Sequence, residues 1–324
     1  MELNSPELRK AMLDLRSRAL SETPDLQSQA MNALDPQYWR SLNSTMTVCG
    51  TEPYEALEMA GSDSSGVDRA LQMYFTWGYY QMPPIVADSA VDRMRKCFEV
   101  TQGAGWHATF VFVYDEFWRA FRGSQLLRFL TGALGDSFGQ LPYIWGHCVP
   151  ANSRGWRPHV DGPSNLKKLT VWLALNDATL ENGCMYVVPR NAETEKISDQ
   201  FLTIESIDRE EAMKLLQNVK ALPAPSGSYL GWGPYLIHWG SASGPLAAGR
   251  ISISAEFAAR PSNSLGDAPT LLDLRPDAPL PSFSTRLRLI AHALQNYEAF
   301  DPRVLRSLPL ADKIISHITA ERTS

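Results

Sequence analysis

The chain has 324 residues, of which 44% are hydrophobic and 20% charged, so it can bury one large core or two small ones. The formal net charge is −5 and no run of Lys or Arg stands out, so we expect no nucleic acid as a partner. The four cysteines form no CxxC pair, which disfavours a zinc ribbon and a thioredoxin-like motif. No segment approaches the length of an apolar membrane span, and the charged amino terminus is unlike a secretory signal. We therefore expect a soluble, cytoplasmic protein that does not bind membranes.

Residues 1–76 are predicted to form a helical extension. Ser5-Pro6-Glu7 resembles a capped helix start, and the stretches 35–39 and 67–77 have helix-like spacing. The run Gly61 to Gly66 consists of Gly, Ser and Asp, which favour turns, so it is the most linker-like stretch of the chain.

Residues 77–260 are predicted to form the main domain, mainly β with flanking helices. A strand at Tyr79–Met82 precedes helices that start at Asp88 or Ser89, at Asp115 and at Ser124. Beyond Tyr143 the chain contains short β-branched and aromatic runs bounded by Gly, Pro and Asn: 169–175, 184–188, 235–238 and 251–257. Several short strands without long helices between them indicate a β-sandwich or jelly roll.

Residues 261–324 are predicted to be a loop followed by helices that pack on the core. The helices are expected at 286–299 and 311–318, and a further surface helix is expected within 206–218. The helical extension and the carboxy-terminal helices could form either a lid over a site or a contact in a homodimer.

The first candidate metal ligands are His159 and Asp161. Of the six histidines, only His159 lies two residues before a carboxylate. Residues i and i+2 of a strand point to the same face, so this spacing can direct an imidazole and a carboxylate at one point. Two imidazoles and a carboxylate bind iron(II) on one octahedral face and leave three positions for a bidentate oxo-acid and dioxygen.

His238 is the candidate for the third ligand because it ends the apolar run 235–237, with room before it for several strands. Each of these residues, taken alone, is only weak support for a metal site. An isolated His-x-Asp occurs by chance in many chains, and a histidine after an apolar strand is more often a hydrogen-bonded structural residue.

Arg250 is the candidate for binding a dicarboxylic oxo-acid. An oxo-acid that chelates iron through one end leaves its second carboxylate inside the barrel, where an unpaired charge would cost several kcal/mol. A guanidinium can meet that carboxylate with two parallel hydrogen bonds. Hydroxyls of Ser252, and of Ser241 or Ser243, could complete the set. Taken singly, Arg250 would be interpreted as a surface arginine at a strand start.

In order and spacing, these residues resemble the phytanoyl-CoA dioxygenase family of iron(II)/2-oxoglutarate oxygenases. The similarity covers roughly residues 78–258 and is carried by His159-Val160-Asp161, "LTVWLALNDA" (169–178), "ENGCMYVVP" (181–189), His238 and Arg250. It implies a double-stranded β-helix core, iron(II), 2-oxoglutarate and oxygen, with succinate and carbon dioxide as co-products. It also implies that Trp172 lines the co-substrate pocket, although a tryptophan in an apolar strand is as often a core residue.

The sequence departs from the family pattern after the distal histidine. The family commonly has a serine close behind it and then a GPN-like turn, whereas here Trp239-Gly240 intervene and the run is Ser243-Gly244-Pro245-Leu246. Which serine helps to bind the co-substrate therefore stays an open question. Asp161 retains the carboxylate, which argues against a halogenase.

The predicted reaction is oxidation of an unactivated C–H bond of an organic small molecule, as hydroxylation or as a related desaturation, cyclisation or epimerisation. A free small molecule of specialised metabolism is favoured because no cationic cluster suits the phosphates of a CoA thioester. Aromatic and cationic residues near the metal motif are the substrate candidates, although each is also typical of a core or rim position: Trp145, His147, Arg157, Trp232 and Trp239.

Two rival functions remain open. Two histidines and a carboxylate also suit zinc hydrolysis, which would need neither oxygen nor oxo-acid and would leave Arg250 unexplained. A jelly-roll binding module without turnover would show a broken ligand set, whereas here all three candidate ligands are present.

Overall fold

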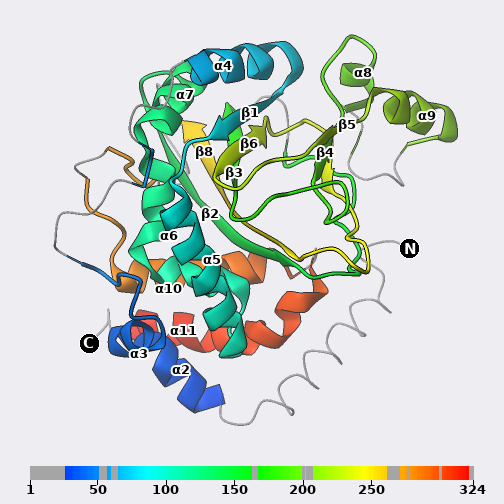
Figure 1. Ribbon diagram of the computed structural model, residues 1–324. Coiled ribbons are helices and arrows are strands. Elements are labelled where there is room, and N and C mark those ends of the chain that lie inside the picture. The colour runs from blue at the N-terminus through cyan, green and yellow to red at the C-terminus, as the bar shows by residue number, and fades with distance from the viewer. Residues whose placement is uncertain are drawn as a thin grey trace. The chain divides into compact units, whose positions relative to one another are not determined.

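The computed structural model describes most of the chain (Figure 1), namely residues 26–50, 57–59, 65–162, 167–198, 201, 207–260, 271–275, 278–298 and 301–320. The predicted helix start at Ser5 and most of the linker-like run 61–66 lie outside these residues. Two compact units result, one from residues 1–52, 97–115 and 279–324, the other from residues 53–96 and 116–278. The boundaries expected near residues 76 and 260 stay a prediction.

The second unit contains a five-stranded antiparallel sheet, here called the major sheet. Its strands run in the order β1 (Tyr79–Pro84), β6 (Ser228–Trp232), β3 (Lys168–Ala174), β8 (Arg250–Ala259) and β2 (Phe138–Val149). In Figure 1, β8 lies beside both β2 and β3, its hydrogen-bonded neighbours. β1 is an edge strand, which explains how it tolerates Pro83 and Pro84.

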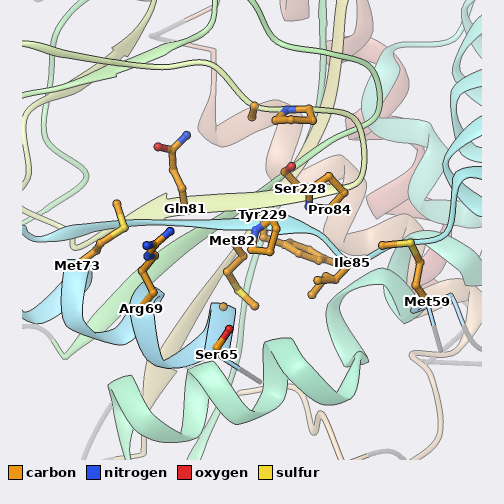
Figure 2. A pocket seen from close by; sticks show the side chains of 14 residues that line it. Met59, Ser65, Arg69, Met73, Gln81, Met82, Pro84, Ile85, Ser228 and Tyr229 are labelled. Carbon is orange, nitrogen blue, oxygen red and sulfur yellow. The ribbon is translucent and has the colours of Figure 1, made fainter. Parts of the chain in front are cut away.

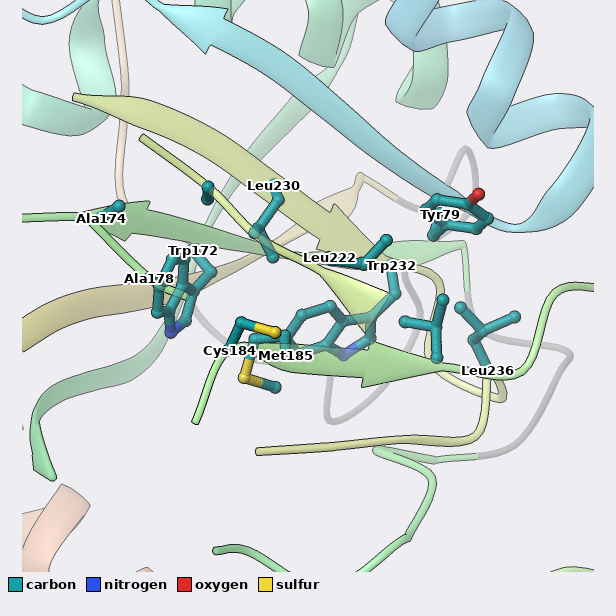
Figure 3. Close-up of a cluster of buried hydrophobic side chains, with 12 residues drawn as sticks. Tyr79, Trp172, Ala174, Ala178, Cys184, Met185, Leu222, Leu230, Trp232 and Leu236 are labelled. Atoms are coloured by element: carbon teal, nitrogen blue, oxygen red, sulfur yellow. The ribbon is translucent and has the colours of Figure 1, made fainter. Parts of the chain in front are cut away.

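A three-stranded antiparallel sheet, the minor sheet, completes this unit. Its order is β5 (Lys220–Leu222), β4 (Met185–Val187) and β7 (His238–Gly240). Buried side chains of both sheets form one cluster (Figure 3), so the sheets pack face to face. The cluster includes Trp172, Leu230 and Trp232 from the major sheet and Met185 and Leu222 from the minor one. Two facing antiparallel sheets form a jelly roll, as the sequence predicts.

Helices accompany the sheets in the second unit. They are α4 (Ser65–Trp77), α6 (Asp115–Arg119), α7 (Ser124–Leu134), α8 (Thr194–Ser198) and α9 (Arg209–Asn218), and α5 (Asp88–Gly103) runs from this unit into the first. Local chemistry explains α9, because Asp208 and Glu211 form a capping box at its start. The sequence-based helices at 67–77, 88–97, 124–134 and within 206–218 are confirmed.

The first unit is helical in its described parts. It contains α2 (Leu26–Leu34), α3 (Pro36–Leu42), α10 (Phe283–Asn296), α11 (Leu308–Ala320) and 3-10 turns at Ala108–Val113 and Pro302–Ser307. Asp115 and Arg286 form a fully buried ion pair, and Asp115 also accepts the backbone N–H groups of Cys49 and Gly50. The predicted helices at 35–39, 286–299 and 311–318 are confirmed, with shifted ends.

Two strand expectations and one linker expectation from the sequence need correction. The run 235–237 is a turn, because Gly233-Pro234 breaks the chain there, and β7 begins only at His238. His159 forms only an isolated bridge to His238 and Asp161 lies in a bend, so the candidate ligands His159 and Asp161 do not lie together on one strand of a sheet. Ser65 and Gly66 were predicted to belong to the linker-like run, but they are the first residues of α4.

Protonation of His107 is expected to lower the stability of the first unit at acidic pH. Burial lowers its pKa to about 4, with Asp301 opposing the shift and Arg303 adding to it. Between pH 6.5 and 4 the unfolded chain takes up a proton that the folded chain excludes, so the free energy of unfolding falls as the pH falls.

His107→Asn tests this titration because Asn keeps an acceptor for the Thr109 N–H at this helix cap. From pH 7 to 4.5, denaturant unfolding should show the wild type losing about 2 kcal/mol more stability than the variant. Parallel losses in both proteins would contradict the assignment.

A cavity of about 920 Å³ lies along β1, between this edge strand and α4 (Figure 2). Arg69 and Met73 approach it from α4 and Gln81 from β1. Its lining includes none of the candidate ligand or co-substrate residues.

Among the helices of the described ranges, none combines the length and the apolar character that crossing a bilayer requires.

Candidate metal centre

His159 and His238 face each other across a reciprocal backbone pair. The N–H of each donates to the carbonyl of the other, at 3.1 Å and 3.0 Å, as in a hydrogen-bonded antiparallel pair. Their ring centroids consequently lie 4.3 Å apart. The backbone pairing thus brings together two histidines that are distant in the sequence.

Both imidazoles present the same nitrogen to the site. His159 Nδ1 lies 2.8 Å from the carbonyl oxygen of Arg157, and His238 Nδ1 lies 2.9 Å from that of Leu236. A carbonyl only accepts, so each Nδ1 carries a proton, and in a neutral imidazole this tautomer leaves the lone pair of Nε2 for a metal. Orientation of a ligating imidazole by such a carbonyl is typical of metal sites.

Asp161 completes a set of three. Its Oδ1 lies 3.6 Å from His159 Nε2 and 3.5 Å from His238 Nε2, and ligand atoms of the three residues lie within 4.8 Å of one another. Among the described residues, this is the one group of three or more His, Cys, Asp or Glu side chains that is spaced to hold a metal ion. Its donor set, two neutral nitrogens and one carboxylate on one side, fits a ferrous ion with open positions.

Electrostatics favour the protonation states that a metal needs. Burial lowers the pKa of His238 to about 4, although Asp161 opposes the shift, so the imidazole is neutral at pH 7. For Asp161, burial raises the pKa, but His238, His159 and a hydrogen bond from Trp232 together outweigh it and lower the pKa. A neutral imidazole and a charged carboxylate are the ligating forms.

Arg250 begins β8 and is buried, with 4% of its surface exposed. Its guanidinium donates to the carbonyl of Gly183, lies 3.6 Å from the Met185 sulfur and packs 5.6 Å from the Trp172 ring centroid. A Cβ at Gly240 would lie 3.1 Å from Arg250 Nη2, so glycine provides the space for the guanidinium.

Polar side chains lie near Arg250 on the inner face of the major sheet. Side chains alternate along β8, so Ser252 lies on the same face as Arg250, with His147 opposite it on β2 and Ala174 opposite it on β3. Buried atoms without a hydrogen-bond partner in the described structure include Ser252 Oγ, Ser243 Oγ and Trp172 Nε1. Buried polar atoms normally have partners, so these atoms suit a polar ligand bound here.

The predicted substrate residues on and after β2 differ in their burial and contacts. His147 Nε2 lies 3.0 Å from Ser254 Oγ, and Trp145, also on β2, is buried. Arg157 is exposed and reaches the site through its carbonyl oxygen.

The two predicted tryptophans near the distal ligand have different surroundings. Trp232 Nε1 donates to Asp161 Oδ2 at 2.9 Å, and its ring lies 4.2 Å from that of His238. Trp239 follows His238 on β7, so its side chain lies on the opposite face, stacked on Tyr186 at 5.6 Å and packed with Val160 in another cluster. The structure therefore does not bring Trp239 to the metal ligands.

Three residues next to Asp161 were missed by the sequence-based prediction. Thr170 Oγ1 donates to Asp161 Oδ2 at 2.9 Å, and Lys168 Nζ lies 3.3 Å from the Asp161 carbonyl oxygen and 2.7 Å from Glu256 Oε2. A signal existed, because Lys168 and Thr170 precede Trp172 at intervals of two residues and therefore share its face of the strand.

Residues 152–244 match the sequence profile of the family described as phytanoyl-CoA dioxygenase (PhyH). The matched segment includes His159, Asp161 and His238, and Arg250 follows it. The predicted resemblance to this family is confirmed for this segment, which contains all three candidate metal ligands. No curated protein matches the sequence.

Several solved structures are similar to the chain. The alpha ketoglutarate dependent epimerase SnoN from nogalamycin biosynthesis is 18% identical, with a TM-score of 0.49 and coverage of 68% of this chain and 95% of SnoN. The carbocyclase SnoK, from the same biosynthesis, is 18% identical, with a TM-score of 0.45 and coverage of 64% and 87%. EctD from S. alaskensis, with 2-oxoglutarate and 5-hydroxyectoine, is 16% identical, with a TM-score of 0.48 and coverage of 63% and 81%. Because these scores are low, the strand pairing itself defines the fold.

Proposed function

We propose that this chain is an iron(II)- and 2-oxoglutarate-dependent dioxygenase that oxidises an unactivated C–H bond of an organic small molecule and releases succinate and carbon dioxide. The observation that carries the proposal is the convergence of His159, Asp161 and His238, with both Nε2 atoms available, inside a jelly roll that also buries Arg250.

His159 Nε2, His238 Nε2 and one oxygen of Asp161 would hold the iron. When bound, the metal supplies the oxidising chemistry, in which 2-oxoglutarate and oxygen are consumed together. The protein's contribution is geometric: the two carbonyl acceptors fix the imidazoles, and the sheets enclose His238, whose side chain is 3% exposed. Enclosure keeps water from the reacting centre.

Arg250 would bind the distal carboxylate of 2-oxoglutarate. Its position at the start of β8 and its burial support this role, since a guanidinium inside the protein can pair with a buried carboxylate through two hydrogen bonds. Ser252 and Ser243 offer hydroxyls for the remaining lone pairs, and Trp172 forms an aromatic wall against the guanidinium. Ser243 is favoured over Ser241 because its buried hydroxyl has no partner in the described structure.

The substrate is proposed to be a small organic molecule, in keeping with specialised metabolism. A cavity of about 280 Å³ supports a small ligand, with Tyr74, Phe75 and Tyr235 in its walls. Lys168 also lines it and donates to the Asp161 carbonyl, which relates the cavity to the metal ligands. His147 and Trp145 remain proposed contacts on the inner side of β2.

The cellular setting is proposed from the sequence. None of the four cysteines, all of them in the described ranges, forms a disulfide, which suits the cytoplasm. We also propose that the helices of residues 1–76 and 261–324 serve as a lid or as the contact of a homodimer.

The test of this function is the stoichiometry of co-substrate turnover. With iron(II), 2-oxoglutarate and air, the protein should release succinate and carbon dioxide in equal amounts, faster when a panel of candidate small molecules contains the substrate. Zinc(II) in place of iron should abolish the release. Hydrolytic activity with zinc and without oxygen would instead identify the hydrolase that the same ligand set allows.

A further inference from the structure

The two oxygens of Asp161 have different surroundings. Oδ1 faces the two imidazoles, at 3.6 Å and 3.5 Å from their Nε2 atoms. Oδ2 accepts two hydrogen bonds, from Thr170 Oγ1 at 2.9 Å and from Trp232 Nε1 at 2.9 Å. One oxygen is thus directed at the metal position and the other is bound to the protein.

The sheet register explains how two donors reach one oxygen. Thr170 on β3 and Trp232 on β6 are direct partners in the antiparallel ladder, so their side chains emerge next to each other from the same face. Both residues are buried, and Figure 3 shows Trp232 extending from β6 into the space between the sheets. The donors therefore have fixed positions on a rigid element.

Asp161 itself lacks such support from its own backbone, because it lies in a bend beyond the single bridge of His159. The major sheet supplies the support through side chains. Besides Thr170 and Trp232, Lys168 donates to the Asp161 carbonyl at 3.3 Å while paired with Glu256 at 2.7 Å. Both the carboxylate and the backbone of Asp161 are thereby anchored to β3, β6 and β8.

We propose that Thr170 and Trp232 are positioning residues that hold Asp161 as a one-oxygen ligand of the metal. This inference rests on the proposed function. Both lone pairs of Oδ2 accept hydrogen bonds, so a carboxylate that bound the metal through both oxygens would leave at least one of the two buried donors without an acceptor. Holding Oδ2 in place keeps three coordination positions for a bidentate oxo-acid and oxygen.

Thr170→Val and Thr170→Ser form a matched pair of variants. Valine keeps the branched shape and removes the hydroxyl, whereas serine keeps the hydroxyl. Cobalt(II) serves as the probe, because its visible spectrum reports coordination. We expect Thr170→Val to bind cobalt(II) about tenfold more weakly than the wild type, with a changed spectrum, and Thr170→Ser to stay within about threefold with the wild-type spectrum.

Trp232→Phe is the second variant, with Trp118→Phe as a control for the loss of another buried indole. Trp232→Phe should weaken cobalt(II) binding about tenfold, and Trp118→Phe should leave it unchanged. Thermal unfolding of the metal-free proteins identifies any variant that does not fold, and the other of the two variants Thr170→Val and Trp232→Phe then carries the test with its own control.

The outcomes separate this inference from the proposed function. Wild-type affinity and spectrum in both folded Thr170→Val and Trp232→Phe would overturn the positioning role and leave the metal site intact. A wild-type protein that binds neither cobalt(II) nor iron(II) would overturn the proposed function and this inference with it.

Discussion

Asp161→Ala is expected to abolish the ferrous site. The substitution removes the only carboxylate of the ligand set, so iron(II) affinity should fall by at least about 100-fold, beyond the losses typical of residues that merely support a ligand. Release of succinate from 2-oxoglutarate should disappear with it. Iron binding is measured by anaerobic titration and succinate by chromatography.

Asp177→Ala is the matched control, because Asp177 is an exposed carboxylate that accepts the Ser226 N–H at 2.8 Å outside the site. This variant should retain iron binding and turnover. Unchanged iron affinity in a folded Asp161→Ala protein would show that the carboxylate is not a ligand.

Arg250→Ala is expected to impair binding of 2-oxoglutarate and to spare binding of iron. Truncating one partner of a buried charge pair costs about 3 kcal/mol, which corresponds to about a 100-fold higher KM for 2-oxoglutarate. Iron(II) affinity without co-substrate should stay unchanged, since the Arg250 guanidinium contacts Gly183, Met185 and Trp172, none of which is a candidate metal ligand.

Arg250→Lys refines this prediction, because lysine keeps the charge and loses the planar fork. It should raise the KM for 2-oxoglutarate by an intermediate factor. Equal effects of Arg250→Ala on iron and on 2-oxoglutarate would indicate a structural role for the arginine instead.

Elements with strong local signals were predictable from the sequence. The helix at 124–134 and the strand at 251–257 have clear periodicity and agree with α7 and β8. The three proposed metal ligands were also recognisable as residue types. Their convergence was not, because it depends on the backbone pair between His159 and His238, which local sequence does not encode.

The failures have identifiable physical causes. The run 235–237 is apolar enough for a strand, yet Gly233-Pro234 turns the chain. Trp239 was a candidate through its proximity to His238, but adjacent residues of a strand face opposite ways, and this rule alone would have removed it. The hydrogen bonds from Thr170 and Trp232 to Asp161 depend on the ladder between β3 and β6, which only the fold reveals.

The division of the chain into two compact units could not be predicted from local sequence patterns either. The first unit combines three separate stretches of the chain, and its buried pair joins Asp115 to Arg286 from two of them. Such pairing of distant segments follows from tertiary packing, not from periodicity.

The most direct test of the central claim is an anaerobic titration of the protein with iron(II) and 2-oxoglutarate, followed by visible absorption. We expect a metal-to-ligand charge-transfer band that saturates at one iron per chain and one 2-oxoglutarate per iron. Absence of this band from folded wild-type protein, or its full retention in Asp161→Ala, would contradict the account.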